Sequence, residues 1–345
     1  MFRAFNLDSR MLKSRSFLAT AGVMALGLAS CGGQDAAVEE PVAVESTEVV
    51  VTSSCSPLSV VTGFYPLQFI AERVGSDQTS VSVLAGPGVE AHDLELTPSQ
   101  AAEVTDADVV VFLPTFMPSL DEAVVELNSS VGLDAMAGLT LLEGEAHDDD
   151  HGHSHDHDHD GDEGHSDKKS TDDEMIVDPH VWLDPTNVSV IGKTLANKLS
   201  ELDPACSAIY ADNSQALTDE MTALDSEMKT ALANCKIKTM VVSHEAFGYL
   251  ANRYGLEQVG ISGLTPEAEP SPKRLAEVAK ISKSDGVTTV YYETLVSPVV
   301  AETLAKELNI KAEKLDPIES KPEGADLIAQ MRANLATLVG GQDCG

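Results

Sequence analysis

Strands alternate with helices in two successive stretches of this sequence. This pattern predicts an α/β fold of two lobes, each with a mainly parallel sheet flanked by helices. Three observations support it. Short apolar runs end in loops rich in Gly, Pro, Asp or His, helical apolar spacing follows most of them, and one long stretch without Gly or Pro separates the two sets. A chain of 345 residues is also long enough for two ordinary domains.

The first lobe is expected over residues 56–185. Its apolar runs predict strands at 58–62, 81–84, 107–113 and 139–142. Proline or a Thr-Pro pair gives the start signal for helices at 65–74, from 97 onward and from 118 to about 130.

Linking helices are expected over 186–235. The segment 205–234 contains no Gly or Pro, and thirty helical residues would span about 45 Å, which suits a stiff strut between two lobes. The second lobe is expected over 236–345. Its predicted strands are 239–243, 259–262, 288–292 and 311–315, and its predicted helices are 247–254, 272–282, 299–308 and 325–339.

The N-terminus has the pattern of a bacterial lipoprotein signal. Basic residues precede an apolar segment at 17–28 that is too short to span a bilayer, and Leu-Ala-Ser-Cys follows at 28–31. We expect a signal peptide at 1–30, lipidation of Cys31 and a flexible tether over 31–55. The expected location is the extracytoplasmic face of the cell membrane, held by the lipid.

Four further cysteines, Cys55, Cys206, Cys235 and Cys344, form no CxxC pair. An even number in an exported chain favours disulfides over a thiolate metal site. Of the three pairings that four cysteines allow, we favour Cys206 with Cys235 and Cys55 with Cys344.

A low-complexity run at 147–165 holds seven of the ten histidines: His147, His151, His153, His155, His157, His159 and His165. No apolar residue occurs from Asp148 to Lys169, so a disordered loop is expected over 145–174. A solvated acidic loop would not need seven histidines. Imidazole with interleaved carboxylates therefore predicts auxiliary metal capture, without selecting one metal. The net charge of −34 favours cations and argues against nucleic acid or an anionic membrane surface as partner.

The other three histidines, His92, His180 and His244, stand alone in predicted loops. In open α/β sheets, ligands bind beyond the carboxyl ends of the strands, and His92, His244 and Asp316 each follow a strand. A lone histidine after a strand is more often a capping or core residue. Together, however, three imidazoles and the Asp316 carboxylate predict a zinc-favouring site between the lobes.

Other carboxylates could supply the fourth ligand in place of Asp316. Glu293 follows another predicted strand, although it also suits an internal hydrogen-bonding role, and Glu90 lies two residues before His92. Asp178 and Asp184 flank His180 and are expected to orient its ring or to serve as alternative ligands.

Five motifs carry a resemblance to a known family: 86–99 (GPGVEAHDLELTPS), 178–185 (DPHVWLDP), 243–249 (SHEAFGY), 292–294 (YET) and 315–317 (LDP). The chain resembles the substrate-binding lipoproteins of zinc and manganese ABC importers, and most closely the high-affinity zinc-uptake type, from about residue 56 to 340.

The resemblance implies two α/β lobes joined by a rigid helix and a metal held by His92, His180, His244 and Asp316. It also implies capture of Zn²⁺ and its delivery to a membrane ABC permease, without catalysis. A histidine at position 244, where manganese members tend to have Glu, favours zinc over Mn²⁺. Ala91 stands directly before His92, where some zinc members have Glu, which counts against a role for Glu90.

Two other functions could also use these histidines. In a zinc hydrolase, three histidines would activate a water, with Glu245 as the best candidate base, but the sequence has no HExxH motif. In a surface adhesin or zinc buffer, the acidic histidine run would be the main agent. Because a metal needs neutral imidazoles, affinity is expected to fall below the histidine pKa of about 6.5.

Overall fold

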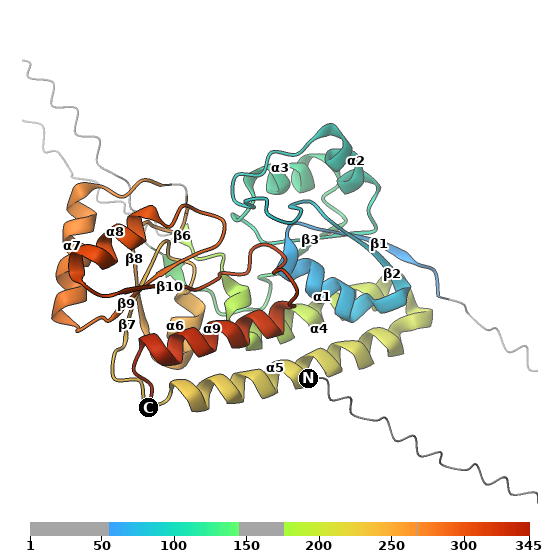
Figure 1. Ribbon diagram of the computed structural model, residues 1–345. Coiled ribbons are helices and arrows are strands. Elements are labelled where there is room, and N and C mark those ends of the chain that lie inside the picture. Colours follow the sequence, from blue (N-terminus) through green and yellow to red (C-terminus); the bar gives the residue numbers. More distant parts are fainter. Residues whose placement is uncertain (1–54, 145–175, 267) are drawn as a thin grey trace, which may run out of the picture. The chain divides into compact units, whose positions relative to one another are not determined.

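The computed structural model describes residues 55–144, 176–266 and 268–345 (Figure 1). The expected signal peptide, Cys31, nearly all of the tether and the histidine run at 147–165 lie outside the described residues. The described residues fall within one unit, Thr52–Gly345, which contains two four-stranded sheets.

The first sheet has the strand order β2-β1-β3-β4, and its neighbouring strands are all parallel. The central strands are the most buried and are rich in valine, as expected for a sheet covered on both faces. Its strands are β1 (Leu58–Thr62), β2 (Thr79–Val83), β3 (Val109–Phe112) and β4 (Gly132–Asp134). Its helices are α1 (Tyr65–Gly75), α2 (Pro98–Asp106) and α3 (Pro118–Leu127), and a short 3-10 turn (Ser76–Gln78) follows α1.

A connecting region leads from the first sheet to the second. The short strands β5 (Glu143–Gly144) and β6 (Ile176–Val177) pair antiparallel on either side of the undescribed segment 145–175. A 3-10 turn (Val181–Leu183) precedes α4 (Pro185–Leu202), and a second one (Pro204–Cys206) precedes α5 (Ser207–Leu232).

Helix α5 is the expected strut. Its 26 residues correspond to about 39 Å. It packs against α1 and α4 on the side of the first sheet and against α6 (Gly248–Tyr254) and α9 (Leu327–Gly341) on the side of the second (Figure 1). Ion pairs link α5 to both groups: Glu220 of α5 pairs with Arg73 of α1, and Glu227 of α5 pairs with Arg332 of α9.

The second sheet has the order β10-β9-β7-β8 and is again parallel. Its strands are β7 (Thr239–Val242), β8 (Glu257–Gly260), β9 (Thr289–Tyr292) and β10 (Lys311–Lys314). Helices α7 (Pro272–Ser284) and α8 (Val299–Leu308) complete this lobe, and the Ser271 hydroxyl caps α7 by accepting the Arg274 N–H. The predicted fold class is confirmed.

One predicted strand is wrong. Residues 139–142 form no strand, and the fourth strand of the first sheet is β4, which lies earlier in the chain and pairs with β3. The apolar run at 139–142 is only partly buried or exposed, and it leads into the short pair of β5 with β6.

The predicted cysteine pairing is also wrong. The structure joins Cys55 to Cys206 and Cys235 to Cys344. Cys206 and Cys235 lie at opposite ends of α5, and a helix of that length keeps them far outside disulfide range. The observed bonds instead tie the two ends of the described chain to the two ends of the strut. Within the described residues, no helix is long and apolar enough to cross a membrane.

Candidate metal site

His180 lies between β6 and the 3-10 turn that begins at Val181. Its ring is fully buried, and its Nδ1 lies 2.8 Å from Oδ1 of Asp178, which also accepts the backbone N–H of His180. Asp178 is itself held, because Tyr249 donates its hydroxyl to the Asp178 carbonyl. The carboxylate therefore fixes the orientation of the ring and leaves Nε2 pointing into the site.

His244 follows β7 after one residue and is equally buried. Its Nδ1 lies 2.8 Å from Oε1 of Glu293, the residue directly after β9. Since β7 and β9 are neighbours in a parallel sheet, their carboxyl ends bring these two side chains together. Glu293, one of the competitors for the fourth ligand, thus makes the internal hydrogen bond that was its alternative role.

His92 lies in the loop between β2 and α2. Its backbone N–H donates to Oε1 of Glu90, and its ring packs against Phe116 with 4.3 Å between the ring centroids. Among the described residues, no carboxylate is hydrogen-bonded to its Nδ1. Its orientation therefore rests on packing and on the loop backbone.

The carboxylate that joins the three histidines comes from Glu319, in the loop between β10 and α9. Asp316, predicted for this position, points elsewhere. Its carboxylate accepts the N–H of Ile318 at 2.8 Å and the hydroxyl of Thr294 at 2.8 Å. Ile318 has a φ of 63°, a left-handed conformation that costs a β-branched residue about 1–2 kcal/mol. This left-handed conformation of Ile318 directs the Glu319 side chain into the site.

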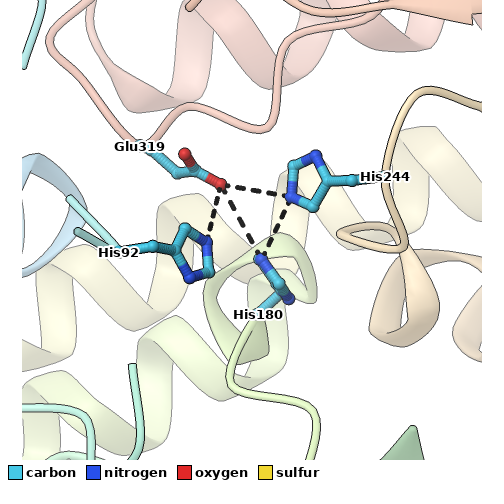
Figure 2. Close-up of side chains that lie close together, drawn as sticks. All are labelled: His92, His180, His244 and Glu319. Carbon is cyan, nitrogen blue, oxygen red and sulfur yellow. Dashed lines mark hydrogen bonds and ion pairs between the residues drawn. The ribbon is translucent and has the colours of Figure 1, made fainter. Parts of the chain in front are cut away.

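The four side chains converge on one point (Figure 2). Oε1 of Glu319 lies 3.6 Å from Nε2 of His92, 3.7 Å from that of His180 and 3.5 Å from that of His244. The Nε2 atoms of His180 and His244 are 3.4 Å apart. Four ligands at about 2.0–2.1 Å from one zinc ion lie about 3.3–3.4 Å apart at the corners of a tetrahedron. The spacing therefore fits a four-coordinate zinc ion with little adjustment.

These donor atoms are costly to bury without a ligand. Nε2 of His92 and both carboxylate oxygens of Glu319 are buried and have no hydrogen-bond partner among the described residues. Buried polar groups are normally satisfied, and an exception signals a missing partner such as an ion. The arrangement is therefore built to receive a cation.

The charges of the four residues set up a competition between a proton and a metal ion for the same donor atoms. Burial acts to lower the pKa of His244, but the carboxylates of Glu293 and Glu319 outweigh it and raise this pKa to about 10. Burial acts to raise the pKa of Glu319, yet the neighbouring rings of His244 and His92 outweigh it and hold this pKa well below its usual value. The pKa of His180 is lowered, because its burial outweighs the opposing effect of Asp178. At neutral pH the metal-free site thus holds an imidazolium next to a carboxylate.

A family described as the periplasmic component A of the zinc-uptake complex, ZnuA, matches residues 60–341. The chain belongs to this family. It is therefore a zinc-binding component of an ABC-type uptake system, a transport protein and not an enzyme.

Three individual relatives are similar to this chain over most of its length. The high-affinity zinc uptake system protein ZnuA of Bacillus subtilis (strain 168) is 34% identical over 337 residues, 95% of this chain and 98% of the relative. The structure of the Zn(II)-bound ZnuA-like domain of Streptococcus pneumoniae AdcA has a TM-score of 0.66 at 30% identity, covering 84% of this chain and 100% of that chain. The structure of the laminin-binding protein Lmb of Streptococcus agalactiae, described as a bifunctional protein with adhesin and metal transporting activity, has a TM-score of 0.69 at 30% identity. The match covers 83% of this chain and 99% of that chain.

The remaining predicted site residues have other contacts. The Glu90 carboxylate is near the cluster, and burial together with the charge of Glu319 raises its pKa. Asp184 caps α4 through the N–H of Thr186 and pairs with Arg253, so it does not contact the His180 ring. Glu245, the candidate base of a hydrolase, accepts from the Gly260 N–H and pairs with Arg274.

Proposed function

We propose that this family member captures one Zn²⁺ ion outside the cytoplasm and delivers it to a membrane ABC permease. The proposed ligands are Nε2 of His92, His180 and His244 and the carboxylate of Glu319. One observation carries the proposal: four nearly buried donor atoms, three of them on separate loops that follow parallel strands, converge at tetrahedral spacing.

The donor set favours zinc over manganese. Imidazole suits zinc, whereas Mn²⁺ prefers more oxygen ligands and octahedral geometry. Two of the three imidazoles have a carboxylate behind them, which makes Nε2 a stronger donor. Asp316 is engaged with Ile318 and Thr294 and adds no oxygen to the cluster.

Capture and delivery require the site to open. The side chains of His180, His244 and Glu319 are at most 1% exposed. A cavity of about 430 Å³ is lined in part by Glu319, Gly88 and Ser320, and the Gly88 N–H donates to the Ser320 hydroxyl at 2.7 Å. This bond joins the loop of His92 to the loop of Glu319, so parting these two loops would expose the ion.

The chain's N-terminus and histidine run complete the proposal. Export and lipidation at Cys31 would hold the protein at the membrane surface close to the permease. The seven histidines of the run at 147–165 would raise the local concentration of metal, while the convergent site supplies the tight binding.

The test measures zinc stoichiometry and affinity by competition with a chromophoric chelator. Three proteins are compared: the full chain, the same chain with His244→Ala, and the chain without residues 147–165. We expect His244→Ala to abolish one tight site and leave weaker sites. We expect the deletion to leave that tight site and remove weaker ones. A tight site that survives His244→Ala and disappears with the run would overturn the proposal in favour of a zinc buffer.

A further inference from the structure

Trp182 is the only tryptophan of the chain and is completely buried. It lies two residues after His180, and the two ring centroids are 5.2 Å apart. It also packs edge-on against Phe64 and Phe116, with ring centroids 4.7 and 5.3 Å away. Its ring therefore belongs to the aromatic core of the first lobe.

Its indole N–H forms a hydrogen bond with a residue outside that core. Nε1 donates to the carbonyl of Pro317 at 2.7 Å, across 135 positions in the sequence. Pro317 lies in the turn after β10 that presents Glu319 to the histidines. One side chain thus connects the segment of His180 to the segment of Glu319.

The bond acts on a particular peptide group. The Pro317 carbonyl and the Ile318 N–H belong to the same planar unit. The indole of Trp182 holds its oxygen end, and the carboxylate of Asp316 holds its N–H end at 2.8 Å. The Asp316 backbone is in turn fixed from α9, since Asn334 accepts the Asp316 N–H and donates to its carbonyl.

These two hydrogen bonds act on the peptide next to the strained residue of the turn, Ile318. The orientation of the Pro317–Ile318 peptide sets φ of Ile318, which is 63°. A β-branched residue adopts this conformation only where its surroundings impose it. If the oxygen end is released, the peptide can rotate toward an ordinary φ, and the Glu319 side chain would move away from the histidines.

We propose that Trp182 is a positioning residue for Glu319, acting through the Pro317 carbonyl, so that the ligands His180 and Glu319 are held by one shared side chain. The inference rests on the proposed zinc site. It gives Asp316 a role as well, because its carboxylate holds the N–H end of the same peptide group and is not a ligand.

The test removes only the donor. Replacing Trp182 by benzothienylalanine puts sulfur in place of the indole N–H and keeps the shape of the ring. Tyr291→Phe is the matched control, since it also removes one buried hydrogen bond, from Tyr291 of β9 to Gln342 at the end of α9, at 2.9 Å. In the full chain, zinc Kd and the zinc dissociation rate are measured with a chelator. We expect the Trp182 change to weaken binding about tenfold, mainly through faster release, and the control to change Kd less than twofold.

A double-mutant cycle identifies the route of the effect. The donor is also removed in the Glu319→Gln background, where we expect less than a twofold further change. In the metal-free chain, we expect faster hydrogen exchange of the Ile318 amide when the donor is absent. An unchanged Kd, or a full tenfold effect that persists with Glu319→Gln, would overturn the inference. Failure of the proposed site itself looks different: Glu319→Gln alone would then leave zinc affinity unchanged.

Discussion

The identity of the carboxylate ligand is the sharpest point on which the structure can be tested. Glu319→Gln and Asp316→Asn make the same change, a carboxylate to an amide of the same shape, in the same loop. The structure places only Glu319 at the cluster, with Oε1 between 3.5 and 3.7 Å from the three Nε2 atoms. The two variants should therefore behave very differently.

The expected loss follows from the ligand count. Four-ligand structural zinc sites bind with about 10–16 kcal/mol, so one ligand accounts for about 2.5–4 kcal/mol, or roughly 100-fold to 1,000-fold in Kd. Part of this loss is offset. The Glu319 carboxylate helps to raise the pKa of His244 to about 10, and without it the proton competes less with the metal. We therefore expect about 100-fold weaker binding for Glu319→Gln near neutral pH.

Asp316→Asn should lower zinc affinity by no more than about threefold, because the amide oxygen can still accept the Ile318 N–H. The assay is chelator competition on both variants and on the wild-type chain, with circular dichroism to confirm folding. The reverse pattern, a large loss for Asp316→Asn and a small one for Glu319→Gln, would refute the ligand assignment made here.

Three further outcomes are expected. Glu293→Gln, which removes the carboxylate behind His244, should weaken zinc binding about 10-fold to 100-fold in the same assay, and an unchanged Kd would contradict its orienting role. Zinc must displace the proton that a pKa of about 10 leaves on His244, so affinity should rise about tenfold per pH unit from about pH 7 to 9, with one proton released per ion in calorimetry. A flat profile over that range would count against the charge pair. Replacing both Cys235 and Cys344 by serine should lower the free energy of unfolding by about 2–4 kcal/mol, and non-reducing peptide mapping of the wild-type chain should recover this pair.

The sequence predicts which three histidines come together in the structure, because their signal is local. His92, His180 and His244 are the only histidines outside the run, and all three occur in loops at strand ends or next to the linking helices. The parallel sheets then bring those loops together. Asp178 beside His180 could also be anticipated from its neighbouring position, and the structure shows the contact at 2.8 Å.

The carboxylate that joins the three histidines could not be predicted in this way. Asp316 follows its strand directly, whereas Glu319 reaches the site only because Ile318 takes a left-handed backbone conformation. Nothing in the sequence of this turn announces a positive φ at a β-branched residue. The contact that supports it, from Trp182 to Pro317, joins residues far apart in the chain. The disulfide pairing failed for a different reason, since the predicted strut already separated Cys206 from Cys235.

The site has two kinds of ligand support, and this bears on how it binds a metal. His180 and His244 are each fixed by a buried carboxylate on their Nδ1, so two of the four donors are in place before metal arrives. His92 and Glu319 depend on loops instead, and the Gly88–Ser320 hydrogen bond joins those two loops. Preorganising two donors reduces the ordering cost of binding, while a loop-borne pair can part for exchange. A site rigid at all four positions would bind zinc tightly but could not release it to another protein. Two fixed donors and two donors on movable loops therefore suit a transport protein, which must both bind the ion and release it.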